Sequence, residues 1–330
     1  MRIFKLIWFL TGLPVSLLSQ AWLSPKGEGT ASVLYQYGFD RLHVFADGRT
    51  KDRGHTFLDS VLLDADFSVT SKLAVRVSLP YISGRYLGRN GHTLVRGQPE
   101  TAVALDNGNF HGSLQDFRFD VRYSLSQGAL KVVPFVQAIV PSHTYPTLGH
   151  AAIGVDVREY RVGVNLGRRL NPILPNAFVQ GRYAFGFSQG VANIAPKRSY
   201  AEFQLGYFLT SRLTLQGAAV LTYSHNGINH DYNLFPDDLT DEQWLNHDRI
   251  SRVNLLDLGA NIGFSFNRST NMVVGVGHSV WGANTHLRTM VVSVGFVKAF
   301  GTRLAGDRPS KTALLPQANK AMVCTCAKSK

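Results

Sequence analysis

Residues 114–125 read LQDFRFDVRYSL, and from Asp116 onward polar and apolar side chains alternate without a break. The apolar set is Phe117, Phe119, Val121, Tyr123 and Leu125, and the polar set is Asp116, Arg118, Asp120, Arg122 and Ser124. Successive side chains of a β-strand point to opposite faces of its sheet, so this stretch predicts a strand with one apolar and one charged face. Lipid on one side and water on the other is the environment that such a strand meets in a membrane β-barrel.

The same alternation recurs along the chain and predicts twelve strands, at 29–39, 57–67, 72–82, 113–125, 130–141, 156–168, 176–188, 198–209, 212–224, 250–266, 270–281 and 286–300. Links after even-numbered strands are short, whereas most links after odd-numbered strands are long: 40–56, 83–112, 142–155, 189–197 and 225–249. Outer-membrane barrels show this layout. The sequence therefore predicts an all-β, antiparallel transmembrane β-barrel of about 12 strands, with both termini in the periplasm.

Composition and aromatic placement agree with this fold class. The chain of 330 residues is 45% hydrophobic and 17% charged, which excludes a disordered chain. Aromatic residues lie near both ends of the predicted strands, as two belts do in membrane barrels. Phe67 and Tyr207 lie near short turns, and Phe39 and Trp281 near long loops. A soluble β-sandwich or a β-solenoid, the alternatives, would gather aromatic residues in a core instead.

The chain divides into three segments. Arg2 and Lys5, an apolar run over 6–18 and small residues before position 22 predict a cleavable signal peptide over 1–21. A membrane anchor is the alternative, but 13 residues span only about 20 Å of a ~30 Å bilayer core. Residues 22–300 form the predicted barrel, located in the outer membrane. Residues 301–330 lack strand alternation and form a basic periplasmic tail, disordered in this interpretation, with Cys324 and Cys326.

Net charge restricts the partners. The signal peptide contributes +2 and the tail +5 to the formal net charge of +12, which leaves +5 for residues 22–300. Such a mild excess does not predict nucleic-acid binding. We expect a monomer in contact with outer-membrane lipids and lipopolysaccharide, folded by the barrel assembly machinery. The last predicted strand ends in Phe300, as strands read by that machinery commonly do.

The charged residues of the alternating strands lie on the face that is predicted to line the lumen. A barrel of 12 strands falls between filled barrels of ~8 strands and open porins of ~16–18, so its bore is narrow. Two interpretations stay open: an ion-pair ladder that holds the barrel in shape, or a lining that selects solutes. The predicted lumen residues are Asp64, Asp66, Arg76, Asp116, Arg118, Asp120, Arg122, Lys131, Glu159, Arg161, Arg182, Glu202 and Asp257.

All 11 histidines fall at the predicted outer end of the barrel. Histidine titrates near pH ~6.5 and binds transition metals, so metal capture and pH gating are open hypotheses beside simple solvation in loops. No pair has the spacing of a metal site, and we predict no metal ligand and no cofactor. The histidines are His43, His55, His92, His111, His143, His150, His225, His230, His247, His278 and His286.

Three neighbouring Ser and His pairs raise the alternative of a lipid hydrolase at the outer rim: Ser142-His143, Ser224-His225 and His278-Ser279. Adjacent strand residues face opposite ways, so we expect no contact within a pair. No Gly-x-Ser-x-Gly motif is present. The sequence therefore predicts that the protein is not an enzyme and has no catalytic residues.

The segments Leu79-Pro80-Tyr81 and 112–123 (GSLQDFRFDVRY) carry a family resemblance. They are similar to the outer-membrane proteins grouped as "meta-pathway of phenol degradation", most clearly over residues 57–145. The resemblance implies an outer-membrane channel, with aromatic or other organic compounds as its solutes. It supplies no residue-level ligand motif.

Together these features predict a channel for passive diffusion of small molecules through a narrow, charge-lined barrel. A closed structural or adhesive barrel that acts through His-rich extracellular loops is the alternative, and a continuous bore distinguishes the two.

Overall fold

The computed structural model describes residues 21–89, 91–126, 128–229 and 239–301. The predicted signal peptide, apart from Ala21, and the predicted tail, apart from Gly301, lie outside the described residues. Within these ranges, no helix is long and apolar enough to cross a membrane.

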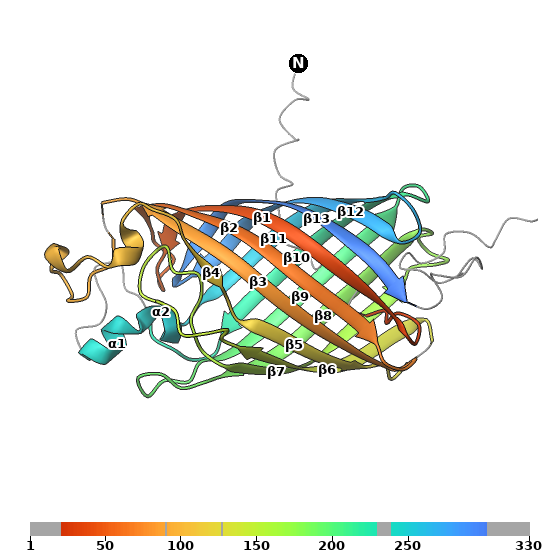
Figure 1. Cartoon of the computed structure of the whole chain (residues 1–330), viewed down its shortest axis with the longest axis horizontal. Coiled ribbons are helices and arrows are strands. Elements are labelled where there is room, and N and C mark those ends of the chain that lie inside the picture. Colours follow the sequence, from red (N-terminus) through yellow and green to blue (C-terminus); the bar gives the residue numbers. More distant parts are fainter. Residues whose placement is uncertain (1–20, 90, 127, 230–238, 302–330) are drawn as a thin grey trace, which may run out of the picture.

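The chain forms one closed antiparallel β-barrel (Figure 1). Each strand pairs with its sequence neighbours, and β1 closes the barrel by pairing with β13. β4 and β5 pair with successive parts of β3 and together take one strand position, or stave, in the barrel wall. The barrel therefore has the twelve staves expected from the sequence. The strands are β1 (Glu28–Val44), β2 (Thr50–Ser68), β3 (Leu73–Leu87), β4 (His111–Leu114), β5 (Phe117–Tyr123), β6 (Leu130–Val140), β7 (Glu159–Arg169), β8 (Ala177–Ser188), β9 (Lys197–Phe208), β10 (Leu213–Ser224), β11 (Asn254–Ser265), β12 (Thr270–Ala283) and β13 (Thr285–Gly301).

Four strand predictions need correction. The predicted strand 113–125 is interrupted, because the backbone of Gln115 donates to Pro80 O at 2.8 Å and the Asp116 carboxylate accepts from the Tyr145 hydroxyl. The predicted loop 40–56 shrinks to five residues, since β1 and β2 continue to pair above the apolar band. β7 begins at Glu159 rather than at 156. β11 begins only at Asn254, because residues 247–250 are helical.

Short helices lie in the long connections, which gather at one end of the barrel (Figure 1). They are η1 (Pro99–Thr101) and η2 (Ala104–Asp106) between β3 and β4, and α1 (Asp241–Leu245) and α2 (His247–Ile250) between β10 and β11. Thr240 caps α1, because its hydroxyl accepts from the backbone of Gln243 while the Gln243 side chain accepts from the backbone of Thr240.

The outer face of the barrel is apolar all the way round. Tyr160, Val162 and Phe203 are each more than half exposed. Water does not tolerate so large a continuous apolar surface, whereas the hydrocarbon of a bilayer does. Similar side chains occur on the other staves, among them Val33, Leu63, Leu79, Phe119, Val136, Tyr183, Leu215, Ile262, Val274 and Val294.

Aromatic rings narrow the barrel at the end with the short links. Trp22 packs edge-on against Phe178, whose ring also lies 5.3 Å from that of Phe208. The Phe178 ring occupies the space that a side chain at position 206 would fill, since a Cβ added to Gly206 would lie 2.2 Å from the ring. Residues just after the predicted cleavage site therefore pack inside this mouth.

Candidate functional site

The structure places all thirteen predicted lumen side chains on buried or half-buried positions of the barrel, opposite the exposed apolar face. Whether they select solutes stays a prediction. Nine of them form ion pairs that fall into four groups, several of which join strands that do not pair with each other. Asp116, Arg118, Lys131 and Glu202 lie outside these groups.

The first group lies between β2, β3 and β5. Arg122 pairs with Asp66 across the intervening strand, and both side chains are almost fully buried. Arg76 pairs with Asp64 at 3.0 Å, and Ser78 also donates to Asp64. Two buried cations and two buried carboxylates thus neutralise one another, which meets the condition for keeping charge away from water.

The second group crosses a wider part of the barrel. Arg182 on β8 pairs with Asp120 on β5 at 3.3 Å, so the contact spans the two staves between them. The Arg182 guanidinium also lies over the Phe135 ring, 3.7 Å from its centroid. Such a contact is available only inside a closed barrel, so both side chains project into the lumen at this level.

The third group surrounds Glu159 near the outer end. This carboxylate accepts from Arg161, from Ser188 at 2.7 Å and from Tyr200 at 3.1 Å. Arg198, a lumen residue absent from the predicted set, approaches it to 3.5 Å. Arg198 shares the parity of Glu202 on the same strand, so the alternation itself could have revealed it.

The fourth group joins Asp257 on β11 to Arg288 on β13. Simple parity does not place Arg288 inside, because the register of β13 against β1 shifts between Phe39 and Asp40. The shift is a β-bulge, which turns side chains on one side of it to the other face. The alternation of polar and apolar residues in the sequence does not predict this bulge.

Arg118 differs from these paired residues. Within the described residues it has no ion pair or hydrogen bond, and its Nε is shielded from solvent. The charges that act on it include the guanidinium groups of Arg161 and Arg76, and the carboxylates of Asp64 and Asp116. Arg118 therefore lies among charges of both signs without a direct partner in the described chain.

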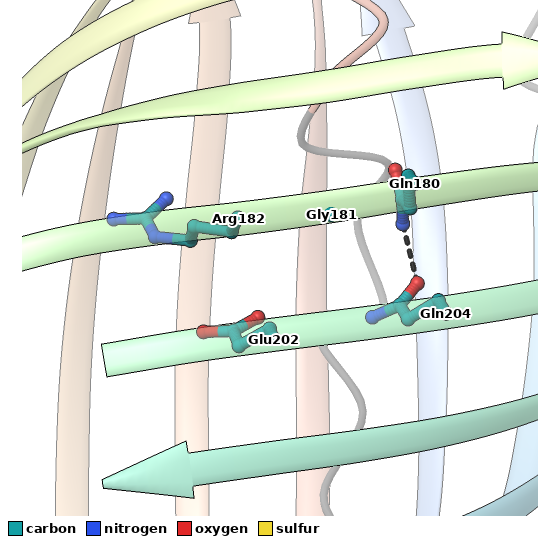
Figure 2. Close-up of a pocket in the computed structure, with 5 residues that line it drawn as sticks. All are labelled: Gln180, Gly181, Arg182, Glu202 and Gln204. Atoms are coloured by element: carbon teal, nitrogen blue, oxygen red, sulfur yellow. Dashed lines mark hydrogen bonds between the residues drawn. The ribbon is translucent and has the colours of Figure 1, made fainter. Parts of the chain in front are cut away.

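A small recess of about 10 Å³, room for about one water molecule, opens beside the second group (Figure 2). Gln180 and Arg182 on β8 and Gln204 and Glu202 on β9 line it, together with Gly181, and Gln180 donates to Gln204. A recess of this size and polarity fits a single water molecule. Glu202 thus belongs to a lined recess as well as to the predicted charge set.

Long loops from opposite sides of the barrel meet over the outer mouth. Trp244 Nε1 on α1 donates to Thr93 O at 3.0 Å, and so joins the β10–β11 loop to the β3–β4 loop. Arg249 donates to Val155 O at 3.0 Å and to Asp156 O at 2.7 Å in the β6–β7 loop. Three loops are thus fastened to one another above the lumen.

Five histidines from five separate parts of the sequence, two at strand ends, two in loops and one on α2, form a continuous cluster at this mouth. Ring centroids are 4.9 Å apart for His43 and His286, 5.2 Å for His286 and His150, 4.3 Å for His150 and His92, and 5.1 Å for His92 and His247. Spacing along the chain did not predict a metal site, because these residues are far apart in the sequence. Asp106 and Asp248 add carboxylates, which makes the cluster the best candidate in the described chain for holding a metal ion.

The environment of the cluster shifts its pKa values in opposite directions. Burial opposes a charge on His92, but the carboxylates of Asp248 and Asp106 outweigh it and raise the pKa of His92. Burial, followed by the nearby His92, lowers the pKa of His150 well below its usual value. Burial also lowers the pKa of His247 against the effect of Asp248. One protonated histidine among neutral ones is the favoured arrangement.

The outer rim holds serine–histidine contacts that the sequence analysis did not expect. Ser142 Oγ lies 2.8 Å from His143 Nδ1, since both residues follow the end of β6 and escape strand alternation. Ser113 lies 3.1 Å from His143 Nε2, and Ser199 lies 2.9 Å from His225 Nε2. Within the described residues no carboxylate bonds to the ring of His143 or His225, so neither histidine has the group that orients a catalytic histidine.

Comparison with solved structures supports the fold. An outer membrane channel from Pseudomonas putida F1 superposes with a TM-score of 0.64 at 12% identity, over 86% of this chain and 98% of that one. The two chains therefore share the same barrel fold. The translocator domain of autotransporter NalP from Neisseria meningitidis (TM-score 0.48, 13% identity, 84% of this chain and 90% of that one) and the NanC porin (0.46, 10%, 81% and 98%) are more distant.

No family model matches the chain, and no curated protein matches it. The resemblance to the "meta-pathway of phenol degradation" group accordingly stays a prediction.

Proposed function

We propose that the protein is an outer-membrane channel for passive diffusion of small organic solutes, with a preference for anions. The apolar outer face and the barrel fold support the location. The solved channel of Pseudomonas putida F1 supports the class of activity. In this proposal the short links and both termini face the periplasm, and the folded chain is a monomer assembled by the barrel assembly machinery among lipids and lipopolysaccharide.

Arg118 is the observation that carries the preference for anions. A half-buried guanidinium whose Nε is shielded from water and has no partner among the described residues is costly, and a ligand or a passing ion would supply the missing charge. Charged side chains at a constriction select ions by sign. The carboxylate of an organic acid fits the Arg118 guanidinium, whereas the neighbouring Arg76 and Arg161 are paired with Asp64 and Glu159.

A channel for neutral hydrocarbons needs an apolar path. The side chains that line this lumen are polar and charged. Ion pairs such as Arg182–Asp120 instead form a narrow polar passage. Passage through it requires the fastened outer loops to open, and the contacts of Trp244 and Arg249 are those that must break.

The test is the reversal potential of the channel in a planar bilayer under a salt gradient. We expect the natural chain to favour chloride over potassium, and Arg118→Gln to lower that permeability ratio about threefold, equivalent to about 0.7 kcal/mol. Arg168→Gln, which alters an exposed arginine near the short links, is the matched control and should leave the ratio unchanged. Cation preference in the natural chain would refute the assignment.

A closed structural or adhesive barrel is the second candidate, and the fastened loops favour it. Three loops joined by side-chain hydrogen bonds form a fixed outer surface, and ion pairs such as Arg182–Asp120 project into the lumen. Such a barrel would give no conductance steps, whereas it would still present its histidine-rich loops to partners outside the cell.

A further inference from the structure

We propose that His92, His247 and Asp248 form a binding site for one divalent transition-metal ion, such as Zn²⁺, at the outer mouth of the barrel. The site does not depend on the protein being a channel. It rests on the positions of three side chains from two loops that start on opposite sides of the barrel.

The donor atoms already have the separation that a metal ion imposes. His92 Nε2 lies 3.1 Å from His247 Nε2, and His247 Nε2 lies 3.3 Å from Asp248 Oδ1. Two ligands of a tetrahedral zinc ion, with bonds of ~2.0–2.1 Å, lie about 3.3 Å apart. Asp248 Oδ2 lies 3.8 Å from His92 Nε2, so the carboxylate faces both rings.

The second nitrogen of each ring is held by a neighbour. Trp244 O accepts from His247 Nδ1 at 2.6 Å, which places the proton on Nδ1 and leaves the lone pair of Nε2 directed at His92. His92 Nδ1 faces Asp106 Oδ2 at 3.4 Å. A carbonyl or carboxylate behind each histidine is the arrangement that orients imidazole ligands in metal sites.

The backbone around the site is also fixed. The capped helix α1 leads directly into α2, which carries His247 and Asp248. Asp106 also accepts from the backbone N of His92 at 2.8 Å, which fixes the β3–β4 loop at this point. The ligands are thus held before an ion binds, so little ordering opposes binding.

Charge favours a cation at this point. Two carboxylates, Asp106 and Asp248, lie among neutral or singly protonated rings. A divalent ion bound here would balance the charge of both carboxylates. Imidazole nitrogen with a carboxylate suits Zn²⁺, Ni²⁺ and Cu²⁺ rather than Ca²⁺ or Mg²⁺.

A second grouping, His92 with Asp106 and His150, is a competing arrangement. It uses the opposite nitrogen of His92 and leaves the two facing Nε2 atoms without a role. We assign the ion to the first grouping, and His150→Ala tells the two apart.

The test is a titration of the folded chain, residues 22–330 with Cys324→Ser and Cys326→Ser, with Co²⁺ followed by displacement with Zn²⁺. Tetrahedral Co²⁺ absorbs visible light far more strongly than aqueous Co²⁺, so the spectrum reports the site itself. We expect one ion per chain. His92→Ala, His247→Ala and Asp248→Asn should each weaken binding by about tenfold or more.

His225→Ala, which removes an outer histidine away from the cluster, is the matched control and should leave the titration unchanged. Heat-modifiable gel mobility confirms folding of each variant, and Asp248→Asn serves if an alanine variant fails to fold. Absence of saturable binding by the folded parent overturns the site. Loss of binding with His150→Ala but not with His247→Ala overturns the assigned ligands.

Discussion

At the scale of single residues, the lumen charges differ in how they are paired. Arg122 and Asp66 are nearly fully buried and lie in direct contact, whereas Arg41 and Asp52 form a pair at the surface with about half of each side chain exposed. Removing one partner of a buried pair leaves the other charge in a medium that solvates it poorly, whereas at the surface water replaces the lost partner.

We therefore expect Asp66→Asn to lower the free energy of unfolding by about 3 kcal/mol. Asp52→Asn should leave the urea midpoint almost unchanged. Urea titration of the refolded barrel, followed by heat-modifiable mobility, measures both variants. Equal midpoints for the two variants would show that the buried pair does not stabilise the barrel.

A second residue-scale prediction concerns the ring of Phe178. An added Cβ at Gly206 meets this ring at 2.2 Å, whereas at Gly217 the nearest atom lies at 3.9 Å. Gly206→Ala should destabilise the barrel by about 1–3 kcal/mol through overpacking. Gly217→Ala is the control and should be close to neutral. A stable Gly206→Ala variant in the same urea titration would mean that Phe178 moves freely.

The sequence was sufficient to place single residues on a face, but not to pair them. Alternation put Asp120 and Arg182 on the charged side of their strands, yet their contact depends on the diameter of the closed barrel. Arg288 was missed because a bulge changes its face. The isolation of Arg118 follows from where its neighbours point, which no local pattern records.

At the scale of elements, the membrane-spanning strands were predictable and the loops were not. Lipid imposes the alternation that reveals a strand, and that signal stops where the chain leaves the membrane. The β1–β2 hairpin continues beyond that point through backbone pairing alone. Helices α1 and α2 are too short to show a periodic pattern, so the meeting of His92 with His247 was hidden.

The contacts between loops give a prediction at this scale. Arg249→Leu removes the hydrogen bonds to Val155 O and Asp156 O. We expect proteinase K to cleave the outer loops several times faster, with the barrel itself still resistant. Arg212→Leu, at an exposed short turn, is the control. Unchanged cleavage of Arg249→Leu would show that other contacts hold the outer surface.

At the scale of the whole molecule, the orientation in the membrane is open to direct test. An epitope inserted after Gly48, where nothing lies within 4 Å of an added Cβ, should be accessible to antibody on intact cells. The same epitope inserted after Gly128, in the short link between β5 and β6, should react only after the cells are permeabilised. The reverse pattern would invert the proposed topology.

The central claim is that the barrel conducts small solutes, and single-channel recording tests it most directly. The refolded chain of residues 22–330, in a planar bilayer with symmetric KCl, should give discrete conductance steps as the outer loops open. Silence from protein whose folding is confirmed by heat-modifiable mobility would contradict the account and favour a closed barrel that acts through its histidine-rich loops.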